Sequence, residues 1–204
     1  MNPTEYLKNV LITKSSDYDA IKCRIDPKMV DLLHAGLGWS SELSELVDAT
    51  YVPNLDDIDY VNIAEEIGDV SWYCSIAIDA LGLDPESVSL YEKDAKWGNL
   101  REKDYEHLRV TTAAIVWASG EFNDLVKKSL FYGREFDLKK AERHLKSLSM
   151  AMAGAAVVCG TTMEKIRETN IAKLKARFAE KFTNAEALNR NLEVERKILE
   201  DGVK

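Results

Sequence analysis

Helix start signals recur along this chain and constrain its fold more than any other feature. Asp26-Pro27 and Asp84-Pro85 each place an aspartate that can cap a helix before a proline at the first helical position. No run with the two-residue period of a strand is long enough to compete with the helical pattern. The sequence therefore predicts an all-α fold.

Helical periodicity fills the segments between the start signals. Two further helices are expected to begin at capping boxes, with Thr161 and Thr183 as the capping residues. One segment places apolar residues on a single helical face by steps of four, three, four and four: Ile63, Ile67, Val70, Cys74 and Ile78. The connections are short, which favours antiparallel neighbours and hence a helical bundle. The expected helices are 27–51, 56–81, 85–97, 103–131, 137–159, 162–180 and 183–200.

Matching positions indicate an internal duplication. At two places in the sequence, two acidic residues spaced three apart come directly before a Leu-Val dipeptide. A glycine follows each dipeptide at a similar distance. The corresponding residues are Glu42 and Glu121, Glu45 and Asp124, and Gly82 and Gly160. We therefore expect an N-terminal helical segment (1–26), a first repeat (27–100) and a second repeat (101–204), together forming one compact structural domain. The alternative is chance similarity, because unrelated amphipathic helices share the same period and can show similar residue patterns.

Charge and cysteine content narrow the function classes. The chain has 204 residues and a net charge of −8, which argues against general nucleic-acid binding. Residues 1–100 carry a net charge of −12, whereas residues 101–204 carry +4. Three cysteines without a Cys-x-x-Cys pair favour a reducing cytoplasm. No apolar stretch reaches the roughly 20 residues of a membrane span, so no membrane partner is expected.

Two acidic pairs are the candidate chemical centre. Glu42 and Glu45 lie on one expected helix, and Glu66 and Asp69 lie on the next. Residues three apart on a helix differ by about 60° in direction, so each pair projects from one face. If the two helices are antiparallel neighbours, four carboxylates converge, and their mutual repulsion favours binding of Mg²⁺ or Mn²⁺. The alternative is a solvated acidic face.

Residues near the acids carry further expectations. Gly68, inside a helix beside Asp69, indicates close approach of a ligand, another backbone or a packing side chain. His34 lies about 20° from Glu45 in helical projection, so it either lines the same cleft or belongs to the core. The tryptophans occupy apolar positions and are expected in the core, although one could stack on a base: Trp39, Trp72, Trp97 and Trp117.

Segments 32–49 and 61–73 resemble the MazG-like all-α nucleoside triphosphate pyrophosphohydrolases, a superfamily that includes the dimeric dUTPases. Its mark is Glu-x-x-Glu followed about twenty residues later by Glu-x-x-Asp, and here residues 46–65 separate Glu45 from Glu66. Segments 125–133, 170–178 and 181–193 resemble other pieces of short phage and bacterial members. In those members all the pieces lie in a single copy of the unit.

The resemblance implies an activity and a site. The activity is Mg²⁺-dependent hydrolysis of a nucleoside or deoxynucleoside triphosphate to the monophosphate and pyrophosphate, with Mn²⁺ as a substitute. Two or more ions would be held by Glu42, Glu45, Glu66 and Asp69, and Glu45 is our choice of general base. Charge on the leaving group would be neutralised by Lys127, Lys128, Lys173 and Arg177. Asn170 and Tyr132 would position phosphate or sugar, and a homodimer is expected.

The chain departs from the short members, because residues 143–147 stand where a second Glu-x-x-Asp would be. The first copy thus supplies the acids and the second copy supplies the basic residues. We expect both halves of the site to meet within one chain, and a site shared between two chains is the alternative. Two other functions stay open: a dUTPase or dCTPase that also acts on diphosphates, and a catalytically silent helical interaction module.

Overall fold

The computed structural model describes residues 1–94, 103–178 and 191–203, and within these ranges the chain forms α-helices and no strand. The all-α prediction is confirmed. The helices are α1 (Pro3–Thr13), α2 (Tyr18–Cys23), α3 (Pro27–Thr50), α4 (Tyr60–Ala80), α5 (Pro85–Asp94), α6 (Tyr105–Tyr132), α7 (Leu138–Val158), α8 (Met163–Arg177) and α10 (Leu192–Val203). A short 3-10 helix, η1 (Leu55–Asp57), precedes α4.

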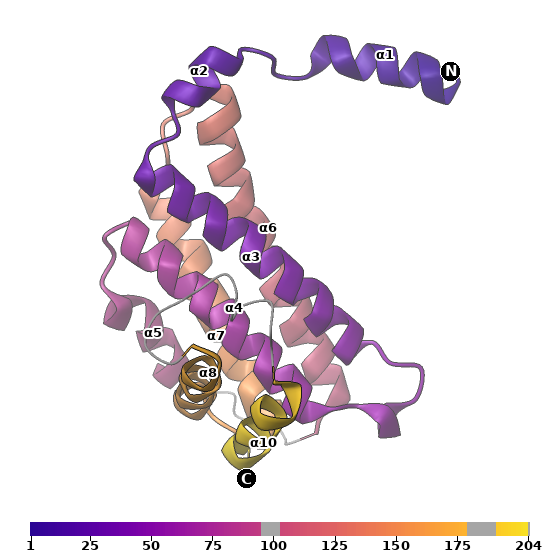
Figure 1. Cartoon of the computed structure of the whole chain (residues 1–204), viewed down its shortest axis with the longest axis vertical. Helices are drawn as coiled ribbons and strands as arrows, with labels where there is room; N and C mark the ends of the chain where they lie inside the picture. Colours follow the sequence, from indigo (N-terminus) through magenta and orange to yellow (C-terminus); the bar gives the residue numbers. More distant parts are fainter. Residues whose placement is uncertain (95–102, 179–190, 204) are drawn as a thin grey trace.

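Four long helices, α3, α4, α6 and α7, form the bundle (Figure 1). Helices α3 and α6 are antiparallel, because contacts pair the start of one with the end of the other. The Trp39 indole N–H donates to Asn123 Oδ1 at 3.0 Å, and the hydroxyls of Thr50 and Thr112 lie 3.1 Å apart. The expected bundle of antiparallel neighbours is confirmed.

The buried apolar residues form one continuous core that spans both halves of the chain. The apolar face predicted on α4, from Ile63 to Ile78, is entirely buried. Trp39 and Phe122 pack edge to face at the centre, with ring centroids 4.9 Å apart. The bundle therefore depends on contacts between the two proposed repeats.

The N-terminal caps of three helices can be compared with the predicted start signals. Asp26 and Asp84 accept from the backbone N–H groups of Met29 and Glu86, so both predicted caps are confirmed. The cap predicted at Thr161 is wrong by one residue: Thr161 N–H still donates to the Ala156 carbonyl at the end of α7. The next residue, Thr162, caps α8 instead.

Two other helices were expected to begin at residues 56 and 183. The helix predicted over 56–81 begins only at Tyr60, because the Asp59 side chain accepts from Val61 N–H and Asn62 N–H and caps α4 there. The start predicted at Thr183 lies outside the described residues.

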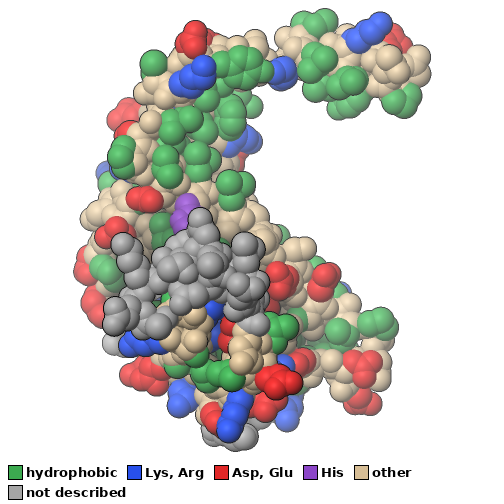
Figure 2. Space-filling model, viewed as in Figure 1, with side chains coloured by type: hydrophobic (Ala, Val, Ile, Leu, Met, Phe, Trp, Pro, Cys, Tyr) green, Lys and Arg blue, Asp and Glu red, His purple; other side chains and the backbone are tan. Residues whose placement is uncertain are grey.

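The remaining helices cover the bundle or leave it. Helix α5 packs on α7, α8 packs on α4, and α10 packs beside α8 and also contacts α4 (Figure 1). Helix α1 buries no residue and stands off the body as an arm with exposed hydrophobic side chains (Figure 2). Among the described helices none is by itself long and apolar enough to cross a membrane, although the bent pair α7 and α8 meets those criteria together.

The Trp39–Phe122 contact predicts where the bundle is most sensitive. Phe122→Ala leaves a cavity at the junction of α3 and α6, so its free energy of unfolding should fall by about 3–5 kcal/mol. Val110→Ala, at an exposed position of the same helix, should change it by less than about 0.5 kcal/mol. Urea unfolding of both variants tests this, and equal losses would contradict the packing described.

Candidate metal-binding cleft

The antiparallel α3 and α4 bring three glutamates together. Glu42 and Glu45 project from α3, and Glu66 projects from α4 opposite them. Each offers a carboxylate oxygen, and these oxygens all lie within 4.8 Å of one another. Carboxylates at this spacing repel strongly unless a cation or protons neutralise them. We call Glu42, Glu45 and Glu66 the glutamate triad.

Glu66 is the member of the triad that most needs a partner. Its side chain is buried, with a residue exposure of 4%, and among the described residues its Oε2 has no hydrogen-bond partner. Burial is the largest cause that raises the pKa of Glu66 to about 8, and repulsion from Glu45 and Asp69 adds to it. A buried, unpartnered carboxylate oxygen facing two further carboxylates fits a divalent cation such as Mg²⁺.

Glu42 is half-buried and accepts a hydrogen bond from the Ser41 hydroxyl at 3.1 Å. Burial and then the nearby charge of Asp69 raise the pKa of Glu42 above its ordinary value. Glu45 is exposed, so it connects the triad with solvent. The triad thus extends from a dry interior to the surface.

Asp69, the fourth predicted ligand, is bound by the protein itself. The Lys173 ammonium on α8 lies 2.9 Å and 2.6 Å from its two carboxylate oxygens and 3.0 Å from Glu65 Oε1. Asn170 Nδ2 also donates to Asp69 Oδ1, at 2.6 Å. The structure therefore brings Asn170 and Lys173 to the acids within one chain. Asp69 lies beside the triad in the same cleft, but Lys173 and Asn170 bind its carboxylate.

Gly68 explains how α8 comes so close. A Cβ atom at this position would lie 3.2 Å from both Cβ and Nδ2 of Asn170, which is tighter than most packing contacts. Of the three interpretations of Gly68, the packing side chain is the one that the structure shows.

Arg177 lines the cleft from the end of α8 and is held by α10. Its Nε and Nη2 donate to Glu195 at 2.9 Å and 2.6 Å, in a bidentate and largely buried pair. A guanidinium has five N–H donors, so this pair leaves others for a bound anion.

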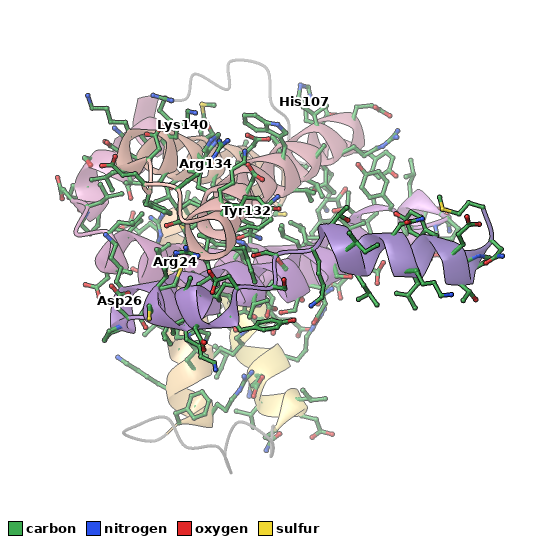
Figure 3. The ribbon with its side chains drawn as sticks, turned by 90° about the horizontal axis from the view of Figure 1, so that it is seen from above. Arg24, Asp26, His107, Tyr132, Arg134 and Lys140 are labelled. Carbon is green, nitrogen blue, oxygen red and sulfur yellow. The ribbon has the colours of Figure 1, made fainter. Side chains whose placement is uncertain are left out.

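Three other predicted binding residues lie elsewhere in the chain. Lys127 and Lys128 are ion-paired with Asp124 on their own helix, and their hydrogen bonds lower the pKa of Asp124 to about 2. Tyr132 is exposed at the end of α6, close to Arg24 (Figure 3). That end of the bundle is opposite α8 and α10 (Figure 1). These three do not line the cleft, and their role in binding stays a prediction.

The triad opens into a cleft of about 740 Å³ with an aromatic wall. His34, Trp72 and Tyr73 form the wall, with ring centroids 5.0–6.0 Å apart in edge-to-face contacts. Gly38 makes room for it, because a Cβ there would lie 2.0 Å from the Tyr73 ring. His34 thus lines the cleft, which settles its two interpretations.

The tryptophan expectation is only partly correct. Trp39 is fully buried, whereas Trp72 is 36% exposed at the cleft and Trp117 is 57% exposed on α6. Trp97 lies outside the described residues.

Sequence reasoning also missed Glu65 and Tyr73. Glu65 lies four residues before Asp69, and this spacing on one helical face was the available signal.

Comparison of the chain with models of protein families, with curated proteins and with solved structures finds no match in any of the three.

The raised pKa of Glu66 predicts an unusual pH dependence. Between about pH 4.5 and pH 8 the folded, metal-free protein binds a proton that the unfolded chain has lost, so its free energy of unfolding falls as the pH rises. Glu66→Gln removes the contribution of Glu66 to this dependence. At pH 8 it should stabilise the metal-free protein by at least about 1 kcal/mol, or about 2–4 °C in Tm.

Thermal unfolding in a chelator at pH 5 and pH 8 measures the difference. The exposed Glu121→Gln on α6 is the control and should follow the parent protein at both pH values. A Glu66→Gln protein that is less stable than the parent at pH 8 would show that the buried Glu66 carboxylate does not destabilise the fold, which would contradict the prediction.

Proposed function

We propose that this protein hydrolyses a nucleoside or deoxynucleoside triphosphate to the monophosphate and pyrophosphate, with Mg²⁺ or Mn²⁺ as the cofactor. One observation carries the proposal: the buried Glu66 carboxylate without a partner, facing Glu42 and Glu45 at the inner end of a nucleotide-sized cleft. The motif resemblance supports the same reaction class independently of the geometry.

The glutamate triad would hold the cation. A bound divalent ion supplies attraction for phosphate oxygens and lowers the pKa of a coordinated water. Glu45, the exposed member of the triad, is the carboxylate that can pass a proton to bulk solvent, which suits a general base. Arg177 would bind the departing pyrophosphate from the opposite side of the cleft.

The aromatic wall would bind the base. Trp72 is partly exposed beside the acids, and an aromatic face stacks on any nucleobase. Leu174 and Phe178 line the cleft as well and add apolar surface. The cleft therefore combines acidic side chains suited to a cation and phosphate with neighbouring aromatic and apolar side chains suited to a base.

The two acidic pairs of the proposed duplication give a matched test. Glu42→Gln removes a triad carboxylate and should lower the rate of pyrophosphate release at least about 10²-fold. Glu121→Gln changes the corresponding residue of α6, which lies on an exposed surface, and should leave the rate within about twofold. A panel of dNTPs with Mg²⁺ provides the assay. Equal losses in the two variants would remove the triad from the mechanism.

The position of attack can be tested separately. Water that attacks the α-phosphorus gives monophosphate and pyrophosphate in a single step, so turnover in ¹⁸O-water should place the label in the monophosphate. Mass spectrometry of the products decides the matter. Orthophosphate released with a diphosphate left behind would contradict the proposed reaction and indicate attack at the γ-phosphorus.

A further inference from the structure

The acids of the cleft divide into two groups with different partners. Glu42, Glu45 and Glu66 face one another, and Glu66 Oε2 has no partner among the described residues. Glu65 and Asp69 lie on the side of α4 that faces α8 and are bound by Lys173. The resemblance, by contrast, implied a single set of four ligands that includes Asp69.

Lys173 uses its full hydrogen-bonding capacity on these two acids. An ammonium group has three N–H donors. Its nitrogen lies 2.6–3.0 Å from three carboxylate oxygens, both of Asp69 and one of Glu65. A second divalent ion at Asp69 would need the same oxygens and would have to displace the ammonium.

Displacement would be costly because Lys173 is buried. The residue is 1% exposed, as little as the centre of the apolar core. Removing its partners would leave a buried charge uncompensated, which typically destabilises a protein by several kcal/mol. A divalent ion that replaced the ammonium would incur this penalty before it gained any ligand.

Helix α8 also holds Lys173 in place. Asn170, one turn earlier on the same face, donates to Asp69, and it fits there because Gly68 has no side chain. Arg177, one turn later, is fixed to α10 through Glu195. Contacts on both sides of Lys173 therefore hold α8, and with it the ammonium, against α4 and α10.

We propose that the Lys173 ammonium stands in for a second divalent cation, so that the free protein binds one ion, at the glutamate triad. The proposal rests on the metal site in the proposed function and revises the expectation of two or more ions. It makes Lys173 and Asp69 positioning residues of the resting site, with Asp69 as the counter-ion of Lys173.

The test is the number of Mn²⁺ ions bound per chain, measured by calorimetry and by the electron paramagnetic resonance of free Mn²⁺. The parent protein should bind one. Lys173→Met keeps roughly the length of the side chain but removes the ammonium from Asp69 and Glu65, and it should bind two. Lys146→Met, which removes a Lys–Glu pair on α7, is the control and should bind one. Two ions in the parent protein, or one in Lys173→Met, would overturn the proposal.

A measurement on the parent protein covers the case in which Lys173→Met does not fold. The ¹⁵Nζ–H signal of Lys173, assigned by its loss in the charge-conserving Lys173→Arg, should persist at saturating Mg²⁺. Its disappearance on Mg²⁺ binding would show displacement and overturn the proposal. Failure of the parent protein to bind any Mn²⁺ is a different result, because it would overturn the metal site of the proposed function itself.

Discussion

The burial of the Glu66 carboxylate between two helices is the constraint on which the rest of the site depends. Helix α4 needs its apolar face in the core, and the register that buries Ile63 and Ile67 also turns Glu66 inward. The facing helix α3 then supplies Glu42 and Glu45 and adds repulsion. A bundle built in this way keeps a negative centre that favours binding of a cation, because a cation relieves both desolvation and repulsion.

The protein balances part of this charge with its own residues. Lys173 neutralises Asp69 and Glu65, and α8 is fixed to α4 by the same contacts that hold the ammonium. The acidic first half of the chain therefore contacts a cation from the basic second half. This contact gives a local reason for the charge asymmetry, although most of the basic residues of the second half lie elsewhere. It also leaves the glutamate triad as the part of the cleft that lacks a positive partner among the described residues.

The fold was predictable because its signals are local. Asp26 and Asp84 cap helices through bonds to residues two or three positions away, and the face of α4 repeats with the helical period. The convergence of the acids was predictable in part for a related reason, because acidic pairs on adjacent antiparallel helices come close together. Glu42, Glu45 and Glu66 meet as expected, whereas the binding of Asp69 by Lys173 depends on the packing of α8. The resemblance implied that Asn170 and Lys173 bind phosphate or sugar in the same site as the acids. In the structure both residues lie next to the acids, where they bind Asp69, and their role toward a substrate stays a prediction.

The other basic residues show where sequence reasoning reaches its limit. Lys127 and Lys128 follow an acidic pair in the sequence, but α6 continues past the level of the cleft and carries them toward its far end, where Asp124 binds them. Trp117 occupies an apolar position in the sequence and is nevertheless exposed. Such placements depend on how helices from distant parts of the chain pack together, which a local pattern does not specify.

The most direct test of the account is a crystal of the protein grown with Mn²⁺ and measured above and below the manganese absorption edge. The account predicts an anomalous difference peak between the carboxylates of Glu42, Glu45 and Glu66, at about 2.2 Å from their oxygens. Absence of a peak at the triad under saturating Mn²⁺, or a peak only at exposed acids elsewhere, would contradict it.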